Sequence, residues 1–249
     1  MTGEASPVTI AMWSGPRNIS TAMMRAFENR ADCAVWDEPL YAYYLQTTGV
    51  DHPGRDAVIR AGETDWRRVV AQLLGPVPGG KGVFYQKHMT HHLLPEVGWD
   101  WFDRVRHGFL IRDPYQVLRS YHQVRGEARA EDIGLHRQWQ IFDHLCQRSG
   151  DPLPVVDTGD FLHDPRRHLE ALCRAFAIPF TERMLHWPAG RRDSDGVWGE
   201  YWYHGVWRST GFAPPPKEQP PDPLPPGLER VLDQCRPVYQ ALRAHRLAV

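Results

Sequence analysis

The chain has 249 residues, 42% of them hydrophobic, and a formal net charge of −1, so we expect one domain over residues 1–249 with a substantial core. The balanced charge argues against a nucleic-acid or acidic-membrane partner, and no apolar run approaches the length of a transmembrane helix. Met1–Pro7 lacks the features of a signal peptide, and the four cysteines are scattered without a Cys-x-x-Cys pair, which together indicate a cytoplasmic protein with reduced thiols.

Five short apolar segments are typical of strands that helices cover on both faces, because several are continuous apolar runs rather than alternating ones. We expect these strands at Val8–Trp13, Cys33–Trp36, Val83–Lys87, Gly108–Ile111 and Leu153–Asp157. Helical patterns lie around residues 20–30, 66–74, 114–125, 132–148, 165–176 and 228–245. The alternation predicts a three-layer α/β sandwich with a mainly parallel sheet. A proline-rich loop over residues 213–226 is expected before the C-terminal helix.

The segment between the first strand and the first helix is the most informative part of the chain. It reads Ser14-Gly15-Pro16-Arg17-Asn18-Ile19-Ser20-Thr21, a tight loop with one cation and two hydroxyls. Backbone N–H groups and the dipole at a helix start attract an anion. A Walker A loop would end in Gly-Lys-Ser/Thr, whereas here Ile19 precedes Ser20 and Arg17 carries the charge. The loop therefore predicts a site for a phosphate-like group without ordinary metal–nucleotide chemistry.

A second candidate for anion binding follows the fourth expected strand. Arg112 stands at the strand end, and Ser120 lies two turns into the helix that begins after Asp113-Pro114. A guanidinium and a hydroxyl in these places can converge on one anion. The alternative is that Arg112 pairs with a carboxylate, and this segment alone does not decide between the two.

Taken together, these segments resemble the sulfotransferases that use 3′-phosphoadenylyl sulfate (PAPS). In that family a strand–loop–helix with a cation and hydroxyls holds the 5′-phosphosulfate, and Arg17, Ser20 and Thr21 match it. An arginine at a strand end and a serine eight residues later hold the 3′-phosphate, and Arg112 and Ser120 have this separation. The likeness continues through Val155–Pro165 and residues 169–180, although Asn18-Ile19 departs from the usual small residues.

The resemblance also implies how the rest of the site is built. In sulfotransferases a late loop closes over the 3′-phosphate and adenine, and Arg208-Ser209-Thr210-Gly211 occupies a comparable place without the more usual Arg-Lys-Gly. The aromatic residues at 198–207 would then line the acceptor pocket or stack on adenine. The expected donor-binding set is Gly15, Arg17, Asn18, Ile19, Ser20, Thr21, Arg112, Ser120, Arg208, Ser209, Thr210 and Gly211. Arg191, Arg192, Asp193 and Asp195, just before it, are expected to form a solvated turn.

The acceptor must lose a proton as it attacks sulfur, so the site needs a general base. Glu38 follows the second expected strand and His88 the third, at the same edge as the first loop. Either fits the resemblance, and each also has a structural alternative, since Glu38 could cap a helix or pair with an arginine and His88 could bond to the backbone. Lys87 is a candidate to neutralise charge on the bridging oxygen during S–O cleavage. The cluster of His88, His91 and His92 has no metal-site spacing, so we expect no metal.

Three functions remain open from the sequence. The first is transfer of a sulfuryl group from PAPS to a hydroxyl or amine of a small molecule. The second is a P-loop kinase of a small metabolite, which the missing Gly-Lys-Ser/Thr disfavours. The third is a nucleotide-binding domain without catalytic activity. The sequence leaves a homo-oligomer and the identity of the acceptor open.

Overall fold

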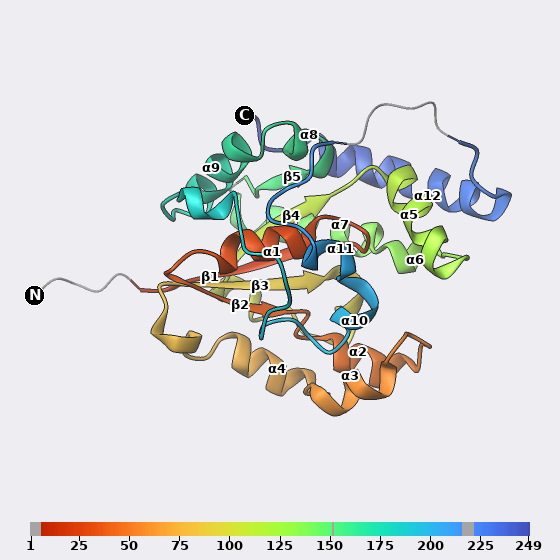
Figure 1. Cartoon of the computed structure of the whole chain (residues 1–249). Helices are drawn as coiled ribbons and strands as arrows, with labels where there is room; N and C mark the ends of the chain where they lie inside the picture. Colours follow the sequence, from red (N-terminus) through yellow and green to blue (C-terminus); the bar gives the residue numbers. More distant parts are fainter. Residues whose placement is uncertain (1–5, 151, 216–221) are drawn as a thin grey trace, which may run out of the picture.

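A computed structural model describes residues 6–150, 152–215 and 222–249. Five strands form one parallel sheet in the order β2-β3-β1-β4-β5 (Figure 1). The strands are β1 Val8–Ser14, β2 Cys33–Asp37, β3 Val83–Met89, β4 Arg106–Ile111 and β5 Val155–Asp157. Helices cover this sheet, so the α/β architecture with a parallel sheet that the sequence predicts is confirmed.

The helices alternate with the strands along the chain. The longer helices before the C-terminal one are α1 Ser20–Glu28, α2 Tyr41–Thr48, α3 Arg55–Ala61, α4 Trp66–Leu73, α5 Pro114–Arg125, α7 Leu135–Ser149 and α9 Pro165–Ala175. Four are shorter, namely α6 Ala130–Ile133, α8 Thr158–His163, α10 Gly199–Trp202 and α11 His204–Trp207. The C-terminal helix is α12 Pro226–Arg243. Short 3-10 turns lie at Pro78–Gly80, Thr90–His92, Phe102–Arg104 and Glu182–Met184.

The strand register brings the loops after the strands to one edge of the sheet. The last residue of β1, Ser14, is level with Met89 at the end of β3. Asp37 at the end of β2 is level with Lys87, and Ile111 at the end of β4 is level with Asp157. Because ligands of open α/β sheets bind outside the carboxyl ends of the strands, this edge is the place to look for a site. The short helices α10 and α11 lie beside it (Figure 1).

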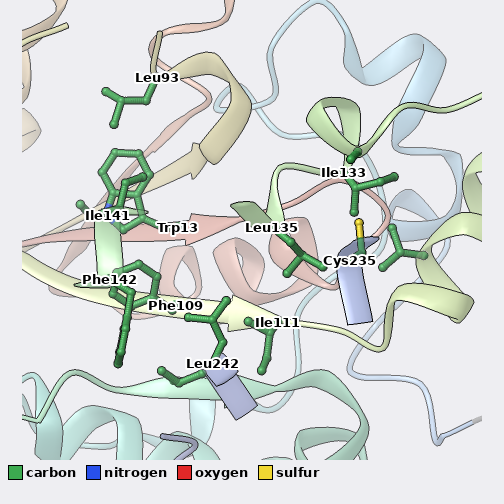
Figure 2. Close-up of a cluster of buried hydrophobic side chains, with 14 of the residues drawn as sticks. Trp13, Leu93, Phe109, Ile111, Ile133, Leu135, Ile141, Phe142, Cys235 and Leu242 are labelled. Carbon is green, nitrogen blue, oxygen red and sulfur yellow. The ribbon is translucent and has the colours of Figure 1, made fainter. Parts of the chain in front are cut away.

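Alternate residues of the central strands pack into different cores on the two faces of the sheet. Trp13 and Phe109 belong to the core beneath α7 and α12, where Phe142 and Leu242 meet them (Figure 2). Their neighbours Met12 and Leu110 face α1 and α9 instead. This two-sided burial is why the strand segments read as continuous apolar runs.

The predicted elements differ from the observed ones mainly at their ends. The helix expected at 132–148 begins at Leu135, because Gly134 has a φ of 75° and separates it from the short helix α6. The third strand extends beyond Lys87 to Met89. The fifth strand is shorter than expected and begins at Val155. Helices α2 and α3 were not predicted from the apolar periodicity.

Among the described residues, no helix combines the length and the apolar composition that crossing a lipid bilayer requires. The expected proline-rich loop at 213–226 falls partly outside the described residues, because these omit 216–221. Its described parts have no regular structure before α12 begins at Pro226.

Candidate active site

A cavity of about 380 Å³ opens at the carboxyl edge of the sheet. The loop and helix start Pro16–Ala22 form one part of its wall. Residues that follow β2, β3 and β4, the α2 helix and parts of the segment 202–213 complete it. The cavity therefore collects side chains from the places where the sequence predicts chemistry.

The first loop leaves the start of α1 open towards the cavity. The first N–H groups of a helix have no partner within the helix, and no side chain caps α1. Asn18 does not serve as a cap, because its Oδ1 accepts a hydrogen bond from the N–H of Ile19 at 2.9 Å and one from the Thr158 hydroxyl. Its Nδ2 donates to the Leu110 carbonyl at 3.1 Å. Asn18 thus fastens the loop to the ends of β4 and β5, which explains the departure from small residues at this position.

Gly15 is part of the same loop but is not among the residues that line the cavity. A Cβ at this position would lie 2.4 Å from the carbonyl oxygen of Ile133. The close approach of α6 therefore requires glycine at position 15. The sequence placed Gly15 in the expected donor-binding set, but the residue does not line the cavity.

Arg17, Arg112 and Ser120 meet at one side of the cavity. The Arg17 Nε donates to the Ser120 hydroxyl at 3.0 Å, and the Arg112 Nη1 donates to the Arg17 carbonyl at 2.7 Å. Within the described ranges, neither guanidinium has a carboxylate within ion-pair distance. Burial lowers the pKa of both groups, and the nearby Arg17 lowers the pKa of Arg112 further. Two partly desolvated cations without counter-ions form an electrostatic site for an anion.

A buried ionic cluster holds Glu38 at the end of β2. The Lys87 Nζ donates to Asp37 Oδ1 at 2.8 Å, to Glu38 Oε1 at 2.6 Å and to the Tyr203 hydroxyl at 2.7 Å. The Tyr203 hydroxyl donates in turn to Asp37 Oδ2 at 2.6 Å and accepts from the Trp198 indole at 3.0 Å. All three ammonium protons of Lys87 are therefore engaged by protein groups. Lys87 fixes one carboxylate oxygen of Glu38.

Glu38 has the geometry and the environment of a general base. Its backbone N–H donates to the Lys87 carbonyl at 2.9 Å, and its φ of 44° lies in the left-handed region. The side chain is 11% exposed and lines the cavity. Burial raises the pKa of Glu38, and the charge of Lys87 opposes this rise in part. A raised carboxyl pKa brings the group closer to the range in which a base works at neutral pH.

The structure does not bring His88 to the cavity. Because β3 continues to Met89, His88 lies within the strand and its side chain is on the opposite face from that of Lys87. Its ring packs on Trp13 with a centroid distance of 4.5 Å, and its Nε2 lies 3.4 Å from Gln86 Oε1. Burial, followed by the neighbouring His107, lowers the pKa of His88 to about 3. Of the two candidate bases, Glu38 lines the cavity and His88 does not.

The late segment contributes only part of the set expected from the resemblance. Ser209 and Gly211 line the cavity, whereas Arg208 and Thr210 are exposed and do not. The Ser209 hydroxyl accepts a hydrogen bond from the Trp187 indole at 3.1 Å. This segment therefore closes the cavity through small residues and presents no cation to it.

The prediction that Asp195 lies in a solvated turn before the aromatic segment is wrong. Its side chain is 4% exposed and pairs with the buried Arg25 of α1. Its second oxygen accepts hydrogen bonds from the Trp207 indole and from the Arg192 N–H, each at 2.9 Å. Asp195 thus fastens the segment that carries α10 and α11 to helix α1, whose first residues line the cavity.

Aromatic residues form a wall of the cavity beside Glu38, and the sequence analysis did not predict most of it. It consists of Tyr41 and Tyr44 from α2, His52, His91, His92, Tyr121 and Trp202. The Tyr41 ring stacks on His92 with a centroid distance of 4.5 Å, and its hydroxyl lies 2.9 Å from the Nδ1 of His52. Only Trp202 belongs to the predicted aromatic stretch. The sequence signal for Tyr41 and Tyr44 was the run Tyr41-Ala42-Tyr43-Tyr44 directly after Glu38-Pro39-Leu40.

The fold and the site define an α/β protein of the P-loop-like type with two unpaired arginines beside an uncapped helix start. Residues 8–246 match the family model described as a sulfotransferase domain, and the chain belongs to this family. Solved structures with the same fold include the sulfotransferase domain from the curacin biosynthetic pathway, with a TM-score of 0.57 and 16% identity over 94% of this chain and 99% of that one. A sulfotransferase from Alicyclobacillus acidocaldarius matches with a TM-score of 0.54 and 12% identity over 98% of each chain.

Two longer relatives from Arabidopsis thaliana are closer in sequence. The branched-chain-amino-acid aminotransferase-like protein 1 is 38% identical over 97% of this chain and 42% of its own length. The corresponding protein 2 is 36% identical over 95% of this chain and 41% of its own length. The chain thus spans about four-tenths of the curated relatives it matches.

Proposed function

We propose that the protein transfers a sulfuryl group from PAPS to a hydroxyl or amine of a small acceptor. The observation that carries this proposal is the pair Arg17 and Arg112, two half-buried guanidinium groups at the open start of α1 that have no carboxylate partner in the described part of the chain. A donor with two separate anionic groups would give each of them a counter-charge. PAPS has this pattern, with a 5′-phosphosulfate and a 3′-phosphate.

In this proposal the 5′-phosphosulfate lies against the amides at the start of α1, with Arg17, Ser20 and Thr21 around it. Arg112 and Ser120 hold the 3′-phosphate, which a guanidinium and a hydroxyl recognise well. The hydrogen bond between Arg17 and Ser120 keeps the two subsites adjacent. Ser209 and Gly211 line the remaining side of the donor.

Glu38 acts as the general base and accepts the proton of the acceptor as it attacks sulfur in line. Lys87 holds Glu38 in place and supplies a positive charge near the transferred group, where negative charge develops as the S–O bond breaks. The acceptor enters from the side of the aromatic wall. The lining on this side combines aromatic rings with polar groups that include the Asp132 carboxylate, and the rings favour a small molecule with an apolar body.

Ligand-induced stabilisation tests the proposal against a kinase of the same fold. The reaction product 3′-phosphoadenosine 5′-phosphate (PAP) should raise Tm without Mg²⁺, and ATP with Mg²⁺ should not. At about 100 times its Kd, PAP would stabilise the fold by about 2.7 kcal/mol, a rise in Tm of about 5–10 °C for a chain of this size. Stabilisation by Mg–ATP alone would contradict the proposal. Binding of PAP without any transfer from PAPS to a panel of alcohols and amines would indicate a non-catalytic domain.

A further inference from the structure

His92 is a buried residue of the cavity wall that has no role in the reaction as proposed above. It ends the 3-10 turn Thr90–His92 that follows β3. The residue is 2% exposed, and its Nδ1 is buried without a hydrogen-bond partner among the residues that the structure describes. The rings of Tyr41 and Tyr44 stack on the imidazole with centroid distances of 4.5 Å and 4.7 Å. A buried polar atom with no partner at the wall of a cavity points to a ligand group that completes its hydrogen bonding.

The unpartnered Nδ1 faces the free oxygen of Glu38. Lys87 holds Glu38 Oε1, and Glu38 Oε2 lies 3.9 Å from His92 Nδ1. This distance is too long for a direct hydrogen bond. It is the separation expected when one oxygen atom lies about 2.8 Å from each group with an angle of about 90° between the two bonds. The pair is therefore spaced to hold a single hydroxyl oxygen.

The imidazole offers a donor in this place. Burial lowers the pKa of His92, so the ring is neutral at pH 7 and has one N–H. The carboxylate of Glu38 next to Nδ1 favours the tautomer that has its proton on Nδ1. His92 can then donate a hydrogen bond, whereas Glu38 accepts one.

We propose that His92 Nδ1–H donates to the acceptor oxygen while Glu38 Oε2 takes the proton of that oxygen, and that this pair selects a hydroxyl over an amine. The inference rests on the proposed sulfuryl transfer. A hydroxyl oxygen has two lone pairs, so one accepts from His92 and the other attacks sulfur. A neutral amine has one lone pair, which must attack sulfur, and it has none left for His92. An amine would therefore leave the buried N–H of His92 without a partner, and this is the penalty that discriminates.

The step balances in atoms and electrons. The free lone pair of the acceptor oxygen forms the new O–S bond, and the O–H proton moves to Glu38 Oε2. The electron pair of the old S–O bond leaves with the 5′-phosphate oxygen of PAP. His92 keeps its proton throughout, which makes it a residue that orients the acceptor and not a second base.

The activity test compares His92→Phe, which keeps an aromatic ring on Tyr41, with His92→Asn, whose amide N–H can approach the position of Nδ1. The probes are phenol with aniline and 2-naphthol with 2-naphthylamine, two matched hydroxyl–amine pairs in which the amine is neutral at pH 7. We expect His92→Phe to lower kcat/KM for the hydroxyl compound by about 10- to 100-fold and that for the amine by about threefold or less. His92→Asn should recover part of the preference. Equal losses for hydroxyl and amine, or a wild-type preference for the amine, would overturn the inference.

A second measurement does not depend on an acceptor. With ¹⁵N-labelled histidine, the His92 signals are assigned by their loss in His92→Phe, and the chemical shifts report which nitrogen has the proton. We expect the Nδ1–H tautomer with PAP bound, and an Nε2–H tautomer would overturn the inference. If PAP does not raise Tm, the proposed function fails instead. The two failures are thus distinguished by PAP binding, which His92 variants should leave unchanged.

Discussion

Arg112 Nη1 donates a hydrogen bond of 2.7 Å to the backbone carbonyl of Arg17, and this bond joins the end of β4 to the loop after β1. The two arginines approach each other although both are cations, and Arg17 lowers the pKa of Arg112. An anion that lies between or beside the two guanidinium groups stabilises this arrangement. Under the proposed function, the bond links the recognition of the 3′-phosphate to the shape of the loop that holds the 5′-phosphosulfate.

Arg112→Ala should weaken PAP binding by about 2–4 kcal/mol, because it removes the charge partner of the 3′-phosphate in a partly desolvated site. Adenosine 5′-phosphosulfate, which lacks the 3′-phosphate, should lose less binding free energy. Its loss measures the effect of removing the hydrogen bond from Arg112 to the Arg17 carbonyl. Isothermal titration of both nucleotides measures the difference. Arg119→Ala is the matched control, since Arg119 lies on the same helix and is half-exposed outside the cavity, paired with Asp222. Equal losses for both nucleotides would mean that Arg112 has a structural role only.

Glu38→Gln should lower turnover by about 100-fold or more and leave PAP affinity nearly unchanged, because the amide keeps the shape of the side chain but cannot take a proton. His88→Asn is the matched control, since His88 is packed on Trp13 away from the cavity. Turnover with PAPS and the best acceptor, corrected for the folded fraction, is the measurement. In the wild type, activity should fall as pH drops through the pKa of Glu38, which burial raises above the ordinary carboxyl range. Full activity of Glu38→Gln would show that a group other than Glu38 takes the proton.

Lys87→Met should lower the free energy of unfolding by about 3–5 kcal/mol, because it leaves buried carboxylates without their counter-ion. Lys87 is 1% exposed and pairs with Asp37 and Glu38. Lys81→Met is the control for loss of a lysine, since Lys81 is exposed and should change stability by about 0.5 kcal/mol or less. Urea unfolding of the three proteins at pH 7 checks this. Similar midpoints for both variants would show that the cluster contributes little to stability.

Stability should decrease as pH falls from 7 towards 5. Burial lowers the pKa of His88 and His91 to about 3 and that of His107 to about 4. In the unfolded chain these histidines bind protons once the pH falls below the ordinary histidine pKa of about 6.5. In the folded protein they bind protons only when the pH falls below their lowered pKa values. Each histidine therefore removes up to about 1.4 kcal/mol of unfolding free energy per pH unit in this window.

Chemical unfolding at pH 7.0 and 5.5 measures the pH effect. His88→Gln should reduce the slope by the contribution of one proton, because glutamine does not titrate. A stability that stays constant between these pH values would show that the buried histidines take up protons without unfolding.

The sequence predicts the parallel sheet and the first loop because their signals are local. A continuous apolar run such as Val8–Trp13 identifies a strand with two covered faces, and the loop residues directly precede the helix. The same logic places Arg112 at a strand end. In each case the neighbours in sequence are also the neighbours that determine the structure.

The predictions that failed depend on a strand end or on contacts between distant residues. Two extra residues at the end of β3 place His88 within the strand and on the face opposite Lys87, and composition does not fix a strand end to that accuracy. Asp195 stands in a polar stretch of sequence, yet it pairs with Arg25, which lies 170 residues earlier. The aromatic wall likewise draws on α2 and on the turn after β3, which only the tertiary fold brings together.

Of the three non-glycine residues with positive φ in the described part of the chain, Arg17 and Glu38 line the cavity. Glycine would adopt these backbone conformations without the steric cost that a Cβ adds, which is of the order of 1 kcal/mol at each position. Selection for backbone stability alone would favour glycine at both, whereas the chain retains a guanidinium and a carboxylate. Consensus or ancestral engineering that relieves strain would therefore reach a trade-off at positions 17 and 38, where lower backbone strain comes with loss of a charged group from the cavity.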